Sequence, residues 1–197
     1  NISGRCTDVE AVGPKGKNYT IWVATASGGV WKSINEGVTF EPVFEHQGTS
    51  TIGDLAITPS NPDIVWVGTG EANIFRSSNP GCGIWKTTDG GESYGTTTNG
   101  IHVDHHAMWI DPHNNRHFWV GCDGGIYESF DLGETFRFVA NLPVTQFYKV
   151  AVDYDEPFYN LYGGTQDNNT QGGPSRTDNI HGIRNSDWFI TLFGDGH

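Results

Sequence analysis

A cluster of metal-ligating and acid–base side chains lies directly before an apolar run, in the segment IHVDHHAMWIDP at residues 101–112. In an extended strand, alternate side chains share one side. If residues 102–106 are extended, this alternation predicts one three-residue set: His102, Asp104 and His106. Two imidazoles and a carboxylate are ligands that Zn²⁺ or another transition metal accepts. The alternative is that these groups hydrogen-bond backbone atoms and water at the start of a strand.

The same segment could instead supply acid–base catalysis. Asp195 and His197 repeat the Asp-x-His spacing of Asp104 and His106. The candidate catalytic residues are Asp104, Asp123, Asp195 and His106. Glycoside hydrolysis needs two carboxyl groups about 5–10 Å apart, and the sequence alone does not fix that separation. Such an enzyme would also need one carboxyl group with a raised pKa.

A second set of polar residues follows predicted strands elsewhere in the chain. Together they offer the acceptors and amides that a sugar or peptide ligand needs. The candidate ligand-binding residues are Glu71, His105, Gln166, Asp167, Asn168 and His197. Turn chemistry and loop solvation are the alternative explanation for each of them.

One pattern is written three times in the chain, as GGVWKSINEGVTF, CGIWKTTDGGESY and DGGIYESFDLGETF. Each copy has a short apolar stretch, then a Ser or Thr, an Asp or Asn two residues on, a Gly and a closing aromatic. The Asp or Asn can bond backbone amides in a hairpin turn, and the Gly can supply a positive φ. We therefore predict that Asn35, Asp89 and Asp131 have a structural role in these turns.

Two further apolar segments precede each box, which gives four predicted strands in each repeat. The spacing between successive boxes is close to the number of residues in one β-propeller blade. We predict an all-β fold, a β-propeller region of four-stranded antiparallel blades. The expected blades are 1–50, 51–100, 101–145 and 146–197, the last with a degenerate box. Trp66, Trp109 and Trp119 fall in strand positions and are expected in the core.

Propeller topology predicts where the polar segments lie. The first strand of a blade begins on the face where the second strand ends, so these points converge on one rim of the central channel. The converging segments are HVDHH, VTQFY and GDGH with GTGEAN, GCDGG and GGTQDN. The box turns join the third and fourth strands, so they are expected on the opposite face.

The boxes resemble the Asp-box, or BNR repeat, of sialidases, sortilin-type receptors and xyloglucanase-like glycoside hydrolases. The strings VGTGEANIFRSS, HVDHHAMWIDP and GGTQDNNTQGGPSRT are similar to those of large, often secreted, sortilin/Vps10-like proteins, many of them labelled glycosyl hydrolases. The resemblance covers nearly the whole chain. It implies the propeller fold and, with the acidic, lysine-poor composition, a secreted or periplasmic protein.

The sequence also departs from this family pattern. Relatives of this type have further blades between the second box and HVDHH, whereas here GGESYGTTTNG runs straight into it. We therefore expect part of a larger propeller, which needs further blades or another chain to protect its edges. In xyloglucanases the segment matching ATASGGVWK carries a catalytic aspartate, but Ala26 and Ser27 stand there. Sialidase activity is disfavoured because no arginine triad with a tyrosine can be assigned.

Composition limits the remaining classes of partner. Twenty-three acidic against eleven basic residues give a formal charge of −12, which disfavours nucleic acid. No apolar run approaches the roughly 20 residues that span a bilayer. The three cysteines match no zinc motif, and no cofactor is expected beyond the metal alternative.

We therefore predict a propeller that binds a protein, peptide or glycan ligand at its channel face. The alternative is a hydrolase of polysaccharides or peptides that uses the carboxylates and histidines of that face. A third possibility is a scaffold that spaces other domains.

Overall fold

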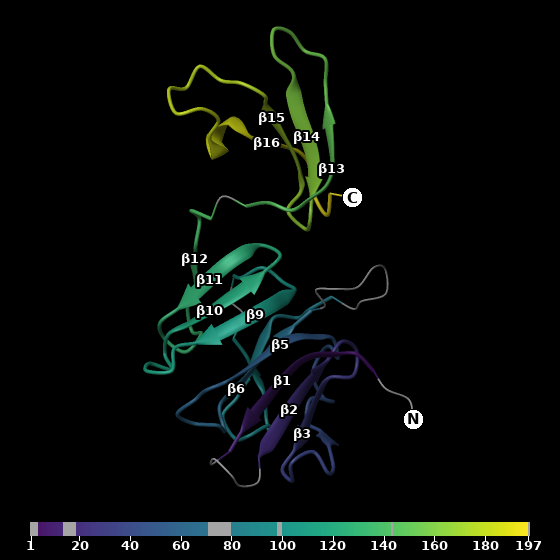
Figure 1. The fold of residues 1–197 in the computed structure, drawn as a ribbon, viewed down its shortest axis with the longest axis vertical. Helices are drawn as coiled ribbons and strands as arrows, with labels where there is room; N and C mark the ends of the chain where they lie inside the picture. Colours follow the sequence, from purple (N-terminus) through teal and green to yellow (C-terminus); the bar gives the residue numbers. More distant parts are fainter. Residues whose placement is uncertain (1–3, 14–18, 71–79, 98–99, 143, 197) are drawn as a thin grey trace. The chain divides into compact units, whose positions relative to one another are not determined.

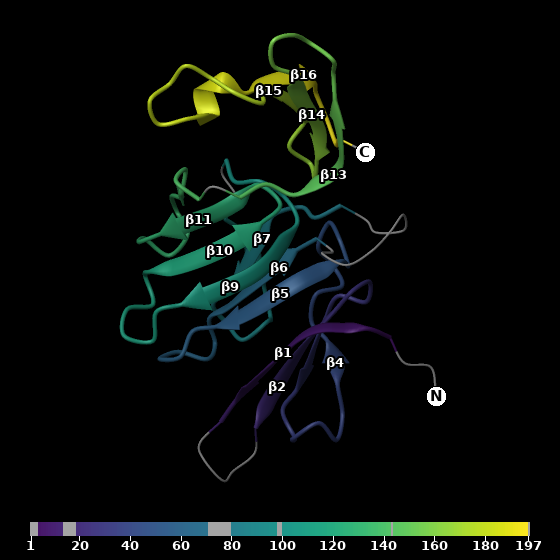
Figure 2. The same cartoon turned by 45° about the horizontal axis from the view of Figure 1, so that its top comes forward.

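The computed structural model describes residues 4–13, 19–70, 80–97, 100–142 and 144–196. It contains four antiparallel sheets of four strands each, and every sheet is built from consecutive strands (Figures 1 and 2). The prediction of an all-β chain of propeller blades is therefore confirmed. The chain divides into two compact units, Asn1–Ala140 and Asn141–His197. Among the described residues, no helix is long and apolar enough to cross a membrane.

The N-terminal unit contains three of the sheets. The first sheet is β1 (Cys6–Val12), β2 (Thr20–Thr25), β3 (Val30–Ser33) and β4 (Glu41–Pro42). The second is β5 (Ile52–Ile57), β6 (Val65–Thr69), β7 (Ile84–Thr87) and β8 (Gly95–Thr96). The third is β9 (His105–Ile110), β10 (Phe118–Cys122), β11 (Gly125–Ser129) and β12 (Arg137–Phe138). The inner strands β1, β5 and β9 lie side by side, with β5 in the middle (Figures 1 and 2).

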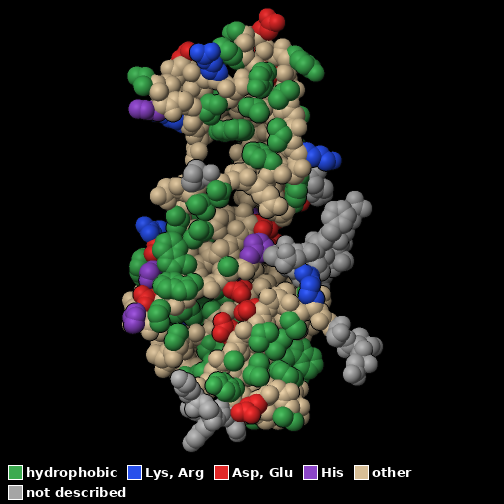
Figure 3. Space-filling model, viewed as in Figure 1, with side chains coloured by type: hydrophobic (Ala, Val, Ile, Leu, Met, Phe, Trp, Pro, Cys, Tyr) green, Lys and Arg blue, Asp and Glu red, His purple; other side chains and the backbone are tan. Residues whose placement is uncertain are grey.

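The C-terminal unit is a single sheet. Its strands are β13 (Phe147–Val152), β14 (Asn160–Thr165), β15 (Thr170–Pro174) and β16 (Phe189–Leu192), with a 3₁₀ turn at Asn185–Asp187. Hydrophobic side chains are spread over the face of this unit that Figure 3 shows. The first and last strands of this unit carry several exposed apolar side chains, which are Tyr148, Val150, Val152, Ile190 and Leu192.

Two apolar clusters hold the N-terminal unit together. The first lies between the β1–β4 and β5–β8 sheets and is centred on Trp22, Phe44 and Leu55. The second lies between the β5–β8 and β9–β12 sheets, where the Trp66 and Phe118 rings are 4.6 Å apart. Full burial of such side chains stabilises a fold by about 1.5–3 kcal/mol each, so these clusters set the spacing of the blades.

The same pattern of hydrogen bonds occurs in each of the three predicted box turns. In the second box, the Asp89 carboxylate accepts the N–H groups of Glu92 and Ser93, each at 3.0 Å, and the Thr87 hydroxyl accepts the N–H of Gly91 at 2.9 Å. Asn35 and Asp131 make the corresponding contacts in the other two boxes. These contacts lie in the loops that join the third and fourth strands of the first three sheets.

The second and third boxes also cover a tryptophan of the preceding sheet. A Cβ atom at Gly91 would lie 2.8 Å from the Trp22 ring, and one at Gly133 would lie 2.9 Å from the Trp66 ring. Both glycines have positive φ, 99° and 80°, so a side chain is excluded by conformation as well as by space. The repeated Gly therefore serves packing between blades in addition to the turn itself.

The prediction that Trp109 and Trp119 lie in the core is wrong for the first and only partly right for the second. Trp66 is fully buried, but Trp109 is 50% exposed and Trp119 is half-buried. Both belong to β9–β12, which is the last sheet of the N-terminal unit, so no later box in this unit covers them. Burial of a strand tryptophan in this fold depends on the following sheet, which strand periodicity does not report.

Aspartates on the inner strands link one sheet to the next. The Asp8 carboxylate accepts the N–H of Leu55 at 3.1 Å, and the Asp54 carboxylate accepts the N–H of Met108. The two carboxyl groups are also hydrogen-bonded to each other. Burial, together with the charge of Asp8, raises the pKa of Asp54 to about 7, so this pair holds a proton in mildly acidic solution and loses it as the pH rises through about 7. Figure 3 shows acidic side chains gathered over the middle of this unit.

Candidate functional site

The inner strand of every sheet has an irregularity directly after its first residue. The pairing register shifts there in all four sheets, which leaves one residue outside the ladder: Thr7, Gly53, His106 and Tyr148. A β-bulge re-aims the side chain of the extra residue, and bulges are common beside active sites. The start of each inner strand is therefore a place where a side chain can turn toward the rim.

The residue that follows the second strand lies at the same end of the sheet as this bulged residue. The four equivalents are Ala26, Gly70, Asp123 and Gln166. His106 Nε2 hydrogen-bonds Asp123 Oδ1, and in the C-terminal unit the Tyr148 hydroxyl hydrogen-bonds the Gln166 side chain. The same two positions thus form a polar pair in the third and fourth sheets, whereas alanine or glycine fills the second position in the first two.

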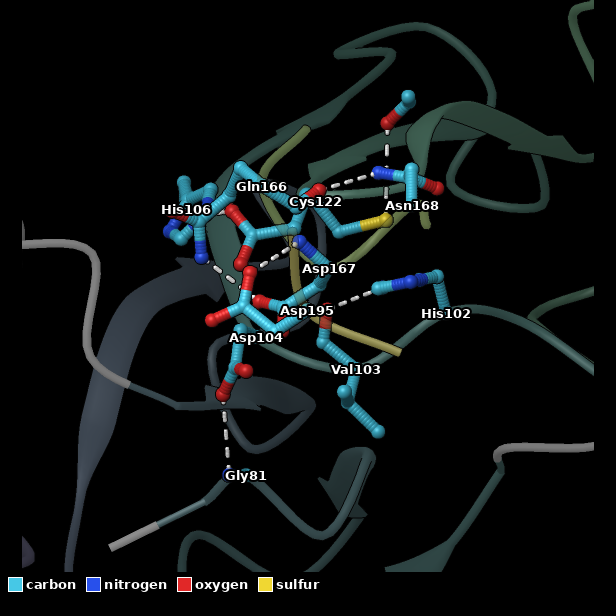
Figure 4. Close-up of polar contacts among 12 residues, drawn as sticks. Gly81, His102, Val103, Asp104, His106, Cys122, Gln166, Asp167, Asn168 and Asp195 are labelled. Carbon is cyan, nitrogen blue, oxygen red and sulfur yellow. Dashed lines mark hydrogen bonds and ion pairs between the residues drawn. The ribbon is translucent and has the colours of Figure 1, made fainter. Parts of the chain in front are cut away.

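Asp104 adds a second carboxylate to the His106–Asp123 pair. One carboxylate oxygen of Asp104 lies within 4.8 Å of one of Asp123. Asp104 Oδ1 accepts the N–H of Gly81 at 3.0 Å, as Figure 4 shows. A Cβ atom at Gly70 would lie 2.4 Å from Asp104, so this approach requires a glycine at position 70. Three of the four candidate catalytic residues are therefore neighbours within the N-terminal unit.

The assumption that residues 102–106 are extended is wrong. The strand β9 begins at His105, and Asp104 has a φ of 59°, in the left-handed region. The simple alternation therefore does not apply, and it is Asp123, on the neighbouring strand end, that is seen beside the Asp104 carboxylate. His102 Nδ1 is 3.2 Å from the carbonyl oxygen of Val103, and its ring packs over Gly124. The metal set of His102, Asp104 and His106 stays a prediction without this geometric basis.

His105 is buried, which contradicts its prediction as a ligand-binding residue at the rim. It occupies the register position of Ile52 in the preceding sheet, and both side chains are 0% exposed. Within the part of the chain that the structure describes, neither ring nitrogen has a hydrogen-bond partner. Burial, followed by the neighbouring histidines, lowers the pKa of His105 to about 4, so the ring is neutral at pH 7.

Cys122 lies beside the carboxylates as a protonated thiol. Its register position is that of Thr25, Thr69 and Thr165, whose hydroxyls donate to a carbonyl of the following turn. Cys122 Sγ makes the equivalent contact at 3.6 Å to the Gly125 carbonyl. Burial raises the pKa of this thiol to about 11, so Cys122 is not a nucleophile at neutral pH. All three cysteines, which also include Cys6 and Cys82, carry free thiols.

The remaining site candidates form a separate group inside the C-terminal unit. The Asp167 N–H donates to Asp195 Oδ1 at 3.0 Å, and the Gln166 side-chain amide donates to Asp167 Oδ2 at 2.7 Å (Figure 4). Asn168 donates its side-chain amide to the Gln166 carbonyl at 2.6 Å. These contacts order the β14–β15 turn against residues 194–196. Glu71 and His197 lie outside the described residues.

Sequence reasoning missed the equivalence of two positions. Ala26 stands where the xyloglucanase resemblance places an aspartate, and the strand pairing makes Asp123 its counterpart in the third sheet. Both positions precede glycines, in TASGG and CDGG, and this shared pattern could have aligned them. Tyr148 was also missed, because only the bulge reveals that its side chain turns to the rim.

Comparison with known proteins gives relatives of one main kind. No family model matches the chain. An oligoxyloglucan-reducing-end-specific xyloglucanase from Emericella nidulans is 30% identical over 123 residues, which covers 57% of this chain and 14% of that protein. The GH74 enzyme of Niastella koreensis superposes with a TM-score of 0.55 at 18% identity, covering 95% of this chain and 30% of the enzyme.

Two further solved structures resemble the chain. An ancestral GH74 enzyme has a TM-score of 0.57 at 19% identity, covering the whole of this chain and 27% of the enzyme. The extracellular domain of BT4673 from B. thetaiotaomicron has a TM-score of 0.51 at 16% identity, covering 86% of this chain and 20% of that one. At these identities the likeness shows the fold, and the chain spans less than a third of each of these proteins. The chain is thus similar to part of a glycosyl-hydrolase-like β-propeller.

Proposed function

We propose that this chain is part of an Asp-box propeller that binds a glycan at its channel rim. The observation that carries the proposal is the group formed by His106, Asp123 and Asp104. Its carboxylate oxygens lie within 4.8 Å of each other, and one carboxylate is hydrogen-bonded to an imidazole. Adjacent carboxylates and an imidazole are suited to bind neighbouring hydroxyl groups of a sugar, since each carboxylate oxygen can accept a charge-assisted hydrogen bond from a hydroxyl.

A glycan is favoured over the peptide alternative by the similar proteins, and over an acidic peptide by charge. The curated relative acts on oligoxyloglucan, and two of the solved structures are GH74 enzymes. The chain carries a net charge of −12, which repels acidic peptides and places no demand on a neutral sugar. A sortilin-like role, in which a peptide occupies the same rim, is the competing function that the experiment below must exclude.

Hydrolysis is a second candidate, because Asp104 and Asp123 are close enough for carboxylate chemistry. Retaining glycosidases place their two carboxyl groups about 5–5.5 Å apart, one as nucleophile and one as acid–base. Asp123, oriented by His106, would take the nucleophile role and Asp104 the acid role. The alanine at position 26 means that any such enzyme would not use the aspartate that the xyloglucanase resemblance implies.

Location outside the cytoplasm follows from the same proposal. A glycan-binding propeller meets polymeric glycans after export, and one structural relative is an extracellular domain. We therefore propose a secreted or periplasmic protein.

Calorimetric titration of the full chain with xyloglucan heptasaccharide, cellotetraose and a neutral tetrapeptide tests the proposal. We expect saturable binding of at least one oligosaccharide, and a loss of at least tenfold in affinity in His106→Ala and Asp123→Asn. Glu92→Gln, an exposed change in a box turn, is the matched control and should bind normally. Binding of the peptide alone would reject the glycan. Release of reducing sugar that disappears in Asp104→Asn and Asp123→Asn would establish the hydrolase.

A further inference from the structure

The first box turn has the same construction as the other two, but among the described residues it covers no tryptophan. Gly91 of the second box and Gly133 of the third each approach a tryptophan ring of the preceding sheet. The equivalent glycine, Gly37, has a φ of 85°, and the atoms nearest to its Cβ position belong to Ile21 and Phe40 of its own repeat. The first box therefore presents a free docking turn at the end of the N-terminal unit where the β1–β4 sheet lies (Figure 1).

The third sheet, at the other end of this unit, has the matching surface. Trp119 has the register position of Trp22 and Trp66, and Trp109 lies opposite it on β9. Trp109 and Phe130 are both exposed to about half of their area. In the first two sheets the following box covers the strand tryptophan, whereas the third sheet is the last of its unit. Its aromatic face is thus of the kind on which a box docks.

The residue beside each strand tryptophan indicates which box fits which sheet. Lys32 donates to the Gly90 carbonyl of the second box at 2.6 Å. Burial lowers the pKa of Lys86, and the negative charge of Glu134 in the third box counteracts this effect. The second box has Glu92 at the same position as Glu134. The boxes that cover these lysines therefore offer them hydrogen-bond acceptors and negative charge.

The third sheet and the first box depart from this pattern together. Glu128 replaces the lysine, and its carboxylate is already paired with His117 and Arg137 of its own sheet. A box with an acidic residue at the position of Glu134 would place a second carboxylate beside it. The first box has Val38 at that position, and this side chain is 80% exposed. The first box is thus the one that avoids a like-charge contact with the third sheet.

An attractive charge pair is available at the neighbouring position. Glu36 of the first box corresponds to Gly90, whose Cβ position is 3.3 Å from Lys32 Nζ of the preceding sheet. In the third sheet the cation of this row is Arg137, whose side chain is largely exposed. The exposed carboxylate of Glu36 and this guanidinium have complementary charges, so the two surfaces fit in polarity as well as in apolar character.

The fourth repeat does not contain an equivalent turn. It has Thr177 and Asn179 at the box spacing, but His181 where each box has its glycine. At Gly91 and Gly133 a side chain is excluded by the tryptophan ring below it. The free box turn that this chain specifies is therefore the first one, and a second copy of the chain can supply it.

We propose that the first box of one copy docks on the third sheet of a second copy, as the second and third boxes dock within the chain. This contact joins two different surfaces, so it is heterologous. Association of this kind ends in a closed ring or continues from copy to copy. The inference goes beyond the proposed function and does not depend on glycan binding.

Two charge substitutions test the two surfaces separately. Val38→Glu gives the first box the acidic residue of the other boxes and places it against Glu128. Trp109→Glu removes an aromatic ring from the third sheet and adds a carboxylate there. Ile180→Glu adds the same charge to a residue that is 95% exposed and outside both surfaces, so it is the matched control. Thermal melting of each variant checks its fold.

Sedimentation velocity of the full chain over a wide range of protein concentrations gives the outcome. We expect the unsubstituted chain and Ile180→Glu to self-associate, and the dissociation constant to rise about tenfold or more in Val38→Glu and in Trp109→Glu. An equimolar mixture of Val38→Glu and Trp109→Glu should form dimers and nothing larger, because each variant retains one intact surface.

Three results would overturn the proposal. The first is an unsubstituted chain that stays monomeric at every concentration. The second is self-association that either substitution leaves unchanged, since it would then use another surface. The third is a mixture of the two variants that stays monomeric, which would show that the first box and the third sheet do not meet.

Discussion

The Asp8–Asp54 pair makes a specific prediction about stability and pH. The pKa of Asp54 is raised from its ordinary value of 3.8 to about 7, first by burial and then by Asp8. Between about pH 4 and pH 7 the folded chain therefore retains a proton that the unfolded chain has released. The contribution of this proton is fully present below pH 4 and is lost as the pH rises toward 7. Stability should fall over that window.

The size of this effect follows from linkage. A shift of about three pKa units corresponds to about 4 kcal/mol if the carboxyl group were fully shielded. Asp54 is partly exposed and faces one titratable neighbour, Asp8 on β1, while β9 offers it the N–H of Met108. Solvent screening reduces the effect, and about 1–2 kcal/mol is the expected loss between pH 4 and pH 7.5.

The test compares the unsubstituted chain with Asp54→Asn in guanidinium titrations at several pH values, followed by tryptophan fluorescence. An asparagine keeps an oxygen for the Met108 N–H and donates to Asp8, so it imitates the protonated acid at every pH. The two proteins should be nearly equal near pH 4 and differ by about 1–2 kcal/mol near pH 7.5, with the variant more stable. Glu92→Gln corrects for a general change of charge. A difference that does not change with pH would refute the reasoning.

Further predictions concern the contacts between sheets. Gly133 and Gly100 both have a φ of 80°, but only Gly133 faces a ring, so Gly100→Ala should cost about 1–2 kcal/mol and Gly133→Ala about 1–3 kcal/mol more in denaturant unfolding. Equal losses would show that the box does not press on Trp66. Trp66→Ala should lower the free energy of unfolding by about 3–5 kcal/mol in the same assay. The same substitution at the half-buried Trp119 should lower it by about 1–2 kcal/mol.

The repeat itself was predictable, because its chemistry is local. A Thr, an Asp and a Gly at fixed spacing determine the turn around Asp89, and the same spacing occurs around Asn35 and Asp131. The period of the boxes then gives the four-stranded blade. None of these inferences needs knowledge of which residues far apart in sequence meet.

The site was predictable only in part, because bulges and burial are not local. The segment HVDHH was identified, but the conformation of Asp104 and the bulge at His106 change which side chains meet. The burial of His105 follows from its register with Ile52, a relation that strand pairing sets. The Asp8–Asp54 pair, absent from the candidate residues, depends on contact between strands of different sheets.

The third sheet lacks two residue types through which the first two sheets contact the sheet that follows them in the chain. Where β1 and β5 have Asp8 and Asp54, β9 has Ala107, which accepts no hydrogen bond through its side chain. Where β3 and β7 have a lysine beside the strand tryptophan, β11 has Glu128.

The two kinds of sheet therefore stabilise the same place differently. Lys32 donates to the Gly90 carbonyl of the next box at 2.6 Å, whereas Glu128 is paired with His117 and Arg137 of its own sheet. The same sheet carries the carboxylates and imidazole of the proposed site. Because residues that bind ligand cannot also serve the repeated packing, we infer that function in this chain is concentrated where the repeat departs from its own pattern.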